Sequence, residues 1–421
     1  MYRIYFKQAL LMLKQNKFIS AIAIIGTALA IMMIMTIIVA DEIKGISAQP
    51  EINRERTLHI NYQVKKDTTK NSWQSGSLSY DIVKDYLYPL KTPRYVSAVT
   101  SIHPKRPSTL VSREGSSEII SADQRLTDAT YWKIFSFSFI KGRPFNEGEF
   151  NSGISVAVVS ETLAKKAFKG ETALGQTILV NFKPYRIIGI VKDVSPVFKR
   201  AYGDLWVPYS SLKKENLYFD VVIMAEKTSD FAAITAEVRN MEKKYNTENA
   251  PWTLYMKGPL NNQFYQKDIR GNSVEDITKS ITIQNRKMIF ILLILLLIPA
   301  INLSGLSLSR MKKRTEEIGI RKAFGAKRYT ILIQVLFENL ITSLIGGGIG
   351  LILSYVIVFR MRDWLLDIPS GSTIPINTLI SIPVLLAVFA VCLVINLLSA
   401  GIPAYRASRM KIINSLNQND N

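Results

Sequence analysis

Few side chains in this sequence belong to the types that perform catalysis or bind metals. Its 421 residues include one cysteine, Cys392, and two histidines, His59 and His103. A structural zinc site takes four ligands, mostly Cys and His, and a disulfide takes two cysteines. No Ser-His-Asp set, paired-carboxylate motif or metal-ligand spacing stands out. We therefore expect no catalytic residues and no metal site, and a membrane-anchored enzyme is the least favoured class.

A phosphate-binding loop is also missing from the sequence. The pattern G-x-x-x-x-G-K-[ST] does not occur, and neither does the dipeptide G-K. Such a loop is what cradles the phosphates of ATP in P-loop proteins. We expect that this chain holds no cofactor and neither binds nor hydrolyses ATP by itself.

Long apolar segments dominate the two ends of the chain. A bilayer-spanning helix needs about 20 apolar residues. The first such run follows four basic residues, as a signal peptide does, but it is too long for one and has no A-x-A cleavage site, so a retained anchor is favoured. Four transmembrane α-helices, one plus three, are predicted at residues 18–40, 288–308, 329–359 and 377–399.

The distribution of Lys and Arg predicts the orientation of these helices. Loops near the cytoplasmic face carry the excess of basic residues. Residues 1–17 contain four basic and no acidic residues, and residues 309–328 contain eight basic residues against Glu316 and Glu317. Both termini and the loop at 309–328 are thus predicted to be cytoplasmic, and residues 41–287 extracytoplasmic.

The basic balance of the chain follows largely from this topology. Lys and Arg number 53 against 33 Asp and Glu, a net charge of +20. Basic residues that flank membrane helices set orientation and attract anionic headgroups. The lipid bilayer is therefore a predicted partner, and nucleic acid is not.

The segment between the first two spans reads as a large α+β domain. Short β-type runs alternate with helical periods, and both ends show the order β-α-β. Predicted elements include a strand at Leu58–Val64, a helix at Tyr80–Leu90 and a strand at Trp252–Lys257. The middle reads as an insertion. The predicted divisions are an amphipathic helix at 1–17, stalks at 41–56 and 266–287, a membrane-proximal lobe at 57–122 and 213–265, a distal lobe at 123–212, a cytoplasmic loop at 309–328, a short outer loop at 360–376 and a cytoplasmic tail at 400–421.

The predicted second and third spans contain residues that favour helix packing or bending. Glu338 is costly in lipid unless it is paired or near the interface, and structural pairing is favoured over a proton relay. Pro299 removes a backbone hydrogen bond and is a candidate hinge or a static kink. Small residues recur every four positions and let helix backbones approach, either within one chain or across a dimer. The helix-packing candidates are Gly346, Gly347, Gly350, Ser354 and Glu338.

One segment carries a family resemblance. Thr315 to Ala326 reads T-E-E-I-G-I-R-K-A-F-G-A. It strongly resembles the signature of the FtsX-like permease family, the membrane subunits of MacB-type ABC transporters. The distal lobe, at Tyr131–Phe145, Ile154–Phe168 and Leu174–Val191, looks like the MacB-type periplasmic core domain.

The resemblance implies a permease subunit in a bacterial cytoplasmic (inner) membrane, with porter-like proximal and sabre-like distal lobes. The triplet Leu303–Gly305 is similar to part of an ABC signature but lies within a predicted span. ATP is then bound and hydrolysed by a separate ABC ATPase, which docks on the cytoplasmic loop. By resemblance, the docking residues are Glu316, Glu317, Ile318, Ile320, Arg321, Lys322 and Phe324.

The mechanism that the resemblance implies is mechanotransmission, in which ATP-driven movement reaches the outer domain through the stalks. A second permease chain, identical or paralogous, is expected. A periplasmic adaptor and an outer-membrane channel stay open, as do export of drugs, peptides or lipoproteins and activation of a cell-wall hydrolase. The alternative class is a signalling or regulatory membrane protein that senses a ligand or activates a hydrolase without net transport. A topogenic, lipid-bound loop is the alternative to docking at 309–328.

Overall fold

The computed structural model describes most of the chain and divides it into two compact units. One unit comprises residues 1–41, 284–365 and 379–421, and the other comprises residues 42–283 and 366–378. The described residues are 2–15, 17–42, 45, 47–70, 72–100, 109–212, 217–262, 274–312, 320, 323–325, 327–361 and the single positions 386, 389, 390, 393, 394, 397, 401 and 405.

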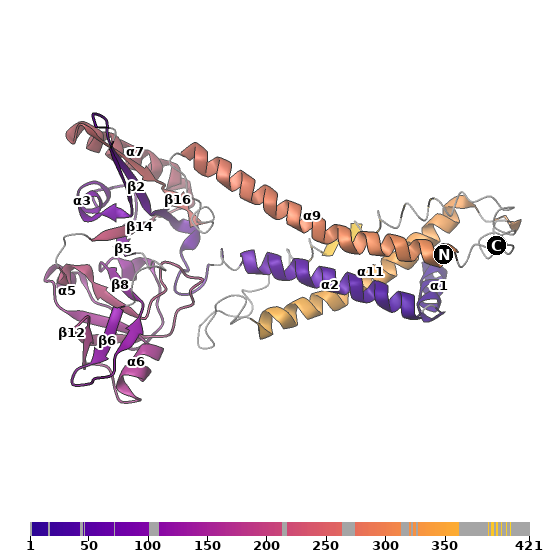
Figure 1. The fold of residues 1–421 in the computed structure, drawn as a ribbon, viewed down its shortest axis with the longest axis horizontal. Helices are drawn as coiled ribbons and strands as arrows, with labels where there is room; N and C mark the ends of the chain where they lie inside the picture. Colours follow the sequence, from indigo (N-terminus) through magenta and orange to yellow (C-terminus); the bar gives the residue numbers. More distant parts are fainter. Residues whose placement is uncertain are drawn as a thin grey trace. The chain divides into compact units, whose positions relative to one another are not determined.

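The first unit is built from long helices (Figure 1). Within the described residues, two stretches are long and apolar enough to cross a membrane, Lys17–Val39 and Tyr329–Arg360. The predicted span at 288–308 lies inside a 39-residue helix, about 58 Å long at 1.5 Å per residue. The helices are α1 (Tyr2–Gln15), α2 (Lys17–Glu42), α9 (Val274–Lys312) and α11 (Arg328–Arg360).

Part of the predicted topology falls on residues that are not described. Most of the fourth span, 377–399, and nearly all of the loop at 360–376 and the tail at 400–421 lie outside the described residues. The total of four transmembrane helices therefore stays a prediction.

The second unit is an α+β domain, which confirms the predicted class of the outer domain. Its main sheet has 13 strands, in the order β16-β1-β14-β5-β8-β13-β10-β12-β11-β6-β7, with β4 beside β14 and β9 beside β12. These strands are β1 (Thr57–Ile60), β4 (Leu78–Ser79), β5 (Tyr95–Val99), β6 (Thr109–Arg113), β7 (Ile120–Ala122), β8 (Gln124–Thr127), β9 (Phe139–Gly142), β10 (Val156–Ser160), β11 (Thr177–Val180), β12 (Lys183–Val191), β13 (Leu205–Pro208), β14 (Tyr218–Met224) and β16 (Leu260–Asn261).

A smaller sheet and several short helices complete this unit. The small sheet has the order β15-β2-β3, and α7 contacts its strand β15. Its strands are β2 (Tyr62–Asp67), β3 (Trp73–Gly76) and β15 (Trp252–Lys257). The helices are α3 (Tyr80–Ile82), α4 (Tyr131–Ile134), α5 (Glu147–Asn151), α6 (Glu161–Phe168), α7 (Phe231–Glu248), the π-helical turn η3 (Val83–Leu87) and the 3₁₀ turns η2 (Arg54–Arg56), η4 (Tyr209–Ser211) and η5 (Thr228–Asp230).

The described residues of this unit form two hydrophobic cores. The first core packs α7 and η3 against β1, β14 and β5, with Phe219 and Ile234 fully buried. The second core packs α6 against β10, β11, β12 and β13, around Phe168 and Ile187. Between them, within the described residues, the main sheet is joined at the pair Val99 and Thr127, next to a hydrogen bond from the Thr100 N–H to the Leu126 carbonyl at 3.0 Å. The two cores are therefore linked by little backbone hydrogen bonding at this point of the sheet.

The structure corrects three details of the sequence reading. The predicted strand at Leu58–Val64 is two strands in different sheets, because fully buried β1 pairs with β14 and β16 whereas β2 pairs with β15 and β3. The predicted helix at Tyr80–Leu90 is three α-helical residues followed by a π-helical turn, closed by the Tyr88 N–H donating to the Val83 carbonyl at 2.9 Å.

The third correction concerns the lobe boundary at residues 122 and 123. Residues 109–122, predicted in the membrane-proximal lobe, form β6 and β7, and β6 pairs with β11. Val111 and Ala122 are buried in the second core. Short strands carry no local signal of which sheet they join, since pairing is decided by distant partners.

The chain enters the outer domain through residues Gln49–Arg56, here called the entry segment. Glu51 is 4% exposed, and its carboxylate accepts hydrogen bonds from the backbone N–H groups of Arg200 and Ala201, each at 3.0 Å. The same carboxylate pairs with Arg54 at 2.6 Å. The sequence predicts a stalk at 41–56, but in the structure Glu51 and Arg54, in the last part of that range, are buried in the folded domain.

This arrangement predicts how a soluble fragment of the outer domain behaves. Residues 47–262 should fold as a stable α+β protein, whereas residues 57–262 lack Glu51 and Arg54 and leave buried N–H groups without their acceptor. Hydrogen bonds to charged groups are worth about 1.5–3 kcal/mol each, so the shorter fragment should be less stable by at least about 2 kcal/mol. Urea unfolding followed by the fluorescence of buried Trp206 measures this. Equal midpoints for the two fragments would contradict the prediction.

Candidate functional site

The cytoplasmic loop predicted at 309–328, here called the coupling loop, is described at a few positions. The Phe324 N–H donates to the Ile320 carbonyl at 3.0 Å, which closes one helical turn. Gly325 follows with φ +89, a left-handed conformation that glycine adopts without strain and that commonly ends helices. Of the predicted docking residues, Glu316, Glu317, Ile318, Arg321 and Lys322 lie outside the described residues.

The described part of the coupling loop exposes apolar surface. Phe324 is 89% exposed and Ile320 is 49% exposed. Because the two side chains are four residues apart on one helical turn, they share a face. An aromatic and an aliphatic side chain held on one face are the kind of anchor that fits an apolar groove of a protein partner. Helix α11 begins soon afterwards, at Arg328.

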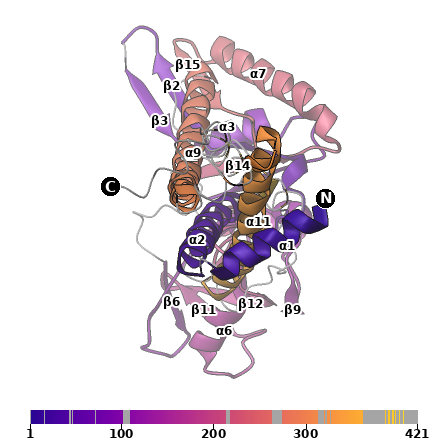
Figure 2. The same ribbon diagram turned by 90° about the vertical axis from the view of Figure 1, so that its right-hand side faces the viewer.

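The small residues of α11 face α2 of the same chain. A Cβ added to Gly350 would lie 2.6 Å from the Ala28 carbonyl oxygen, and one added to Gly346 would lie 2.9 Å from the Ile24 carbonyl oxygen. The two helices also lie side by side in Figures 1 and 2. At these two positions the close approach is therefore packing within one chain, one of the two alternatives that the sequence leaves open.

The other helix-packing candidates are also buried or in close contact. A Cβ on Gly347 would lie 2.4 Å from the ring of Phe389. Ser354 is 4% exposed and donates to the Leu351 carbonyl at 2.7 Å. Glu338 is 9% exposed and accepts a hydrogen bond from the Gln334 side chain at 3.3 Å, so it has the polar partner that its burial requires.

Pro299 lies in the interior of α9, whose helical assignment runs unbroken from Val274 to Lys312. A proline there leaves the carbonyl four residues earlier without its helical donor. Its assignment as a hinge stays a prediction.

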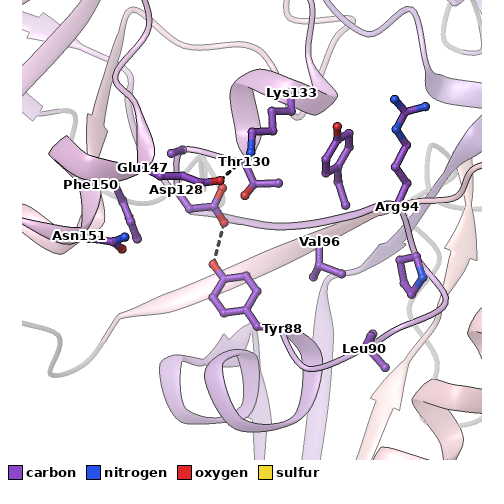
Figure 3. Close-up of a pocket in the computed structure, with 13 residues that line it drawn as sticks. Tyr88, Leu90, Arg94, Val96, Asp128, Thr130, Lys133, Glu147, Phe150 and Asn151 are labelled. Carbon is purple, nitrogen blue, oxygen red and sulfur yellow. Dashed lines mark hydrogen bonds and ion pairs between the residues drawn. The ribbon is translucent and has the colours of Figure 1, made fainter.

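A cavity of about 400 Å³ lies in the outer domain. One wall comes from the stretch after η3 and from β5, with Tyr88, Arg94 and Val96, and the other from the region of α4 and α5, with Lys133 and Phe150 (Figure 3). Within this second wall, the Lys133 ammonium pairs with the Glu147 carboxylate at 2.6 Å. The sequence reading missed this cavity, because its walls come from two segments, 88–96 and 128–151, that are more than 30 residues apart in the chain.

A buried carboxyl group lies on the wall of the cavity. Asp128 accepts from the Tyr88 hydroxyl at 2.7 Å, the Ser97 hydroxyl at 2.7 Å and the Ala98 N–H at 2.8 Å. Burial raises the pKa of Asp128, although these donors act in the opposite direction. Burial also raises the pKa of Tyr88 well above its usual value, and the charge of Asp128 adds to this rise. The Tyr88 hydroxyl therefore stays protonated, and its hydrogen bond to Asp128 connects the two walls of the cavity.

The chemistry of these sites is that of packing and docking. Among the residues that the structure describes, no group of three or more His, Cys, Asp or Glu side chains is placed to hold a metal ion. In the cavity, Tyr88 donates a hydrogen bond to Asp128, and Lys133 pairs with Glu147. The expectation of no cofactor stays a prediction.

The glycine contacts generate a test with a matched control in the same helix. Gly350→Ala forces a methyl group against the backbone of α2 and should destabilise the helix pair by about 1–3 kcal/mol, the usual cost of overpacking. Gly348→Ala is the control, because nothing lies within 4 Å of the position of its Cβ. The midpoint of thermal unfolding in one detergent should fall for Gly350→Ala alone. Equal midpoints for both variants would mean that α2 and α11 do not pack closely at Gly350.

Two family models match this chain. The model of the MacB-like periplasmic core domain matches residues 20–241, more than half of the chain. The model of the FtsX-like permease C-terminal region matches residues 289–412. Both matches confirm the resemblance that the sequence motifs indicate.

Curated relatives and solved structures are similar to the chain as well. The macrolide export ATP-binding/permease protein MacB of Escherichia coli (strain K12) is 23% identical over 422 residues, which cover 98% of this chain and 60% of that protein. The uncharacterized ABC transporter permease YknZ of Bacillus subtilis (strain 168) is 28% identical over 248 residues, which cover 56% of this chain and 60% of that protein. The chain thus spans about 60% of the length of these relatives.

The solved structures are outer domains. The extracellular domain of the noncanonic ABC-type transporter YknZ from Gram-positive bacteria matches 47% of this chain and 99% of that chain, with 16% identity and a TM-score of 0.37. The periplasmic region of MacB from Actinobacillus actinomycetemcomitans matches 50% of this chain and 94% of that chain, with 16% identity and a TM-score of 0.35. From the two family models, the chain belongs to the MacB-like periplasmic core domain family and carries an FtsX-like permease C-terminal region.

Proposed function

We propose that this chain is the permease subunit of a MacB/FtsX-type ABC transporter. The observation that carries the proposal is the pair of family matches, an outer core domain at 20–241 and a permease region at 289–412. The relative that aligns over 98% of the chain is named as both ATP-binding protein and permease, while the chain covers 60% of it. The matched part fits the permease role, and the sequence contains no phosphate-binding loop.

The proposed mechanism has a separate ABC ATPase that hydrolyses ATP and drives a conformational change of the outer domain, for export of drugs, peptides or lipoproteins. A second permease chain completes the assembly, because ABC ATPases of this type act as dimers. The proposed membrane arrangement is multi-pass, with both termini on the cytoplasmic side and residues 41–287 outside. A periplasmic adaptor and an outer-membrane channel are further proposed partners for export across two membranes.

The coupling loop supports ATPase docking over a purely topogenic role. The orientation of membrane helices requires basic residues in the loop but no apolar ones. Phe324 and Ile320 nevertheless present apolar surface, and its exposure costs free energy. Glu316 and Glu317 add nothing to orientation, since acidic residues contribute little to it. A protein partner explains both the apolar and the acidic residues.

Docking is tested by co-purification of the tagged chain with its ATPase. Phe324→Ala and, separately, Arg321→Glu combined with Lys322→Glu should each lower the recovered ATPase at least tenfold, because the loss of an interface anchor typically costs about 2 kcal/mol or more. Membrane insertion should persist, since other basic residues still set the topology.

Phe182→Ala is the matched control for Phe324→Ala. Phe182 is 73% exposed and lies in the turn between β11 and β12 of the outer domain. It should leave ATPase recovery unchanged. Full recovery of the ATPase by both loop variants would assign the coupling loop to topology alone.

A further inference from the structure

The entry segment contacts both halves of the outer domain. The first half is the part built around the first core, and the second half is the part built around the second core. On the side of the second half, the Pro50 carbonyl accepts from the Ser136 N–H at 2.8 Å, and the Asn53 side chain donates to the Ile134 carbonyl at 3.0 Å. On the side of the first half, the Arg56 carbonyl accepts from the Ala225 N–H at 2.9 Å, next to β14. The segment that follows α2 in the chain is thus bonded to elements of both halves.

A buried set of charges extends this contact into the connection between β12 and β13, residues 192–204. Arg54 is 2% exposed, donates to the Val197 carbonyl at 2.8 Å and lies over the Phe198 ring at 4.8 Å. Arg200, in the same connection, is ion-paired with Asp220 of β14. Glu51 joins the two arginine positions, since it pairs with Arg54 and accepts from the N–H of Arg200.

These charged side chains are almost fully buried. Arg200 and Asp220 are 4% and 3% exposed, and Arg54 and Glu51 are 2% and 4% exposed. Next to them, burial lowers the pKa of His59 well below its usual value, and the charges of Arg200 and Arg54 lower it further, so His59 is neutral. Removing one member of a buried charge set is strongly destabilising, so these side chains hold one another in place.

The rest of the interface between the halves is weaker in backbone bonding. Among the described residues, the main sheet crosses it at the pair Val99 and Thr127, beside which the Thr100 N–H donates to the Leu126 carbonyl at 3.0 Å. The chain leaves the domain differently, after β16, which pairs with β1 at the edge of the first half. A displacement that arrives through the entry segment therefore meets the 192–204 connection directly, whereas one that arrives through β16 meets the first half alone.

We propose that Glu51 is a positioning residue, through which movement of the first membrane helix is delivered to the 192–204 connection and so shifts the two halves of the outer domain relative to each other. The inference rests on the proposed function, since it assigns the point of force transfer for the same ATP-driven cycle. It predicts that the backbone N–H groups of Arg200 and Ala201 report on the nucleotide state of a distant ATPase.

The test is hydrogen exchange of the full chain with its ATPase in lipid nanodiscs, with and without a non-hydrolysed ATP analogue. In the unmodified protein, exchange of the peptide that covers residues 195–203 should differ between the two nucleotide states. In Glu51→Gln, exchange at Arg200 and Ala201 should be about tenfold faster, because a neutral amide accepts more weakly than a carboxylate. The difference between nucleotide states at 195–203 should then be lost.

Two controls separate coupling from general loosening. Glu147→Gln changes an exposed carboxylate of the same domain, 62% exposed and paired with Lys133, and should keep the nucleotide-dependent difference. Exchange in α7 should be the same in all variants, which shows that the first core is intact. If Glu51→Gln does not assemble, Arg54→Lys serves instead, since it keeps the charge but loses the planar fork of donors.

The outcomes distinguish this inference from the proposed function. A Glu51→Gln protein that keeps the full nucleotide-dependent difference at 195–203 would overturn the inference. So would an unmodified complex that binds its ATPase but shows no difference there, and in that case the permease assignment stands. An unmodified chain that recovers no ATPase would remove the proposed function and the inference together.

Discussion

The outer domain depends on how it satisfies an irregular stretch of buried backbone. Residues 192–204 form no strand, yet Phe198, Arg200 and Ala201 within this stretch are buried. Buried backbone groups need partners, and here charged side chains supply them. Arg54 bonds to one carbonyl of the stretch, and Arg125 bonds to the carbonyls of Lys199 and Tyr202. These two arginines come from different parts of the chain, and Arg200 of the stretch pairs with Asp220, so the stretch draws the entry segment, β8 and β14 together.

The long helices obey a different constraint. In lipid there is no hydrophobic gain from bringing two helices together, so close backbone approach has to come from small side chains. Gly346 and Gly350 meet the backbone of α2, and Glu338 has a neighbouring amide in Gln334. Packing of α2 with α11 thus requires glycine at particular positions, while lipid-facing positions tolerate any apolar residue.

The sequence predicted the parts of this protein that local patterns encode. The apolar runs at 18–40 and 329–359 fall within α2 and α11, because a membrane helix needs a long uncharged stretch. Strand β15 was predicted with the right bounds, since its β-type run is flanked by turn residues.

The parts that were missed depend on distant partners. Glu51 and Ala201 are 150 positions apart in the chain, and the run P-E-I-N-R-E-R looks like an ordinary solvated stalk. Assignment of β6 and β7 to the second core likewise rests on pairing with β11, some 65 residues later. The walls of the cavity at Tyr88 and Asp128 likewise come from segments that are far apart in the chain. A pattern within a short window carries no information about such contacts.

The place where the second half joins the first has a consequence for how the protein can diverge. The chain leaves the first half after β5 and returns to it at β14, and these are adjacent antiparallel strands with Val99 opposite Asp220. The second half is therefore inserted at the position where a hairpin turn would otherwise connect β5 and β14. Since the ends of the inserted stretch are already neighbours, its length can change at a small cost in loop-closure entropy. Related proteins can thus enlarge, trim or replace this half while the register of the first sheet stays the same.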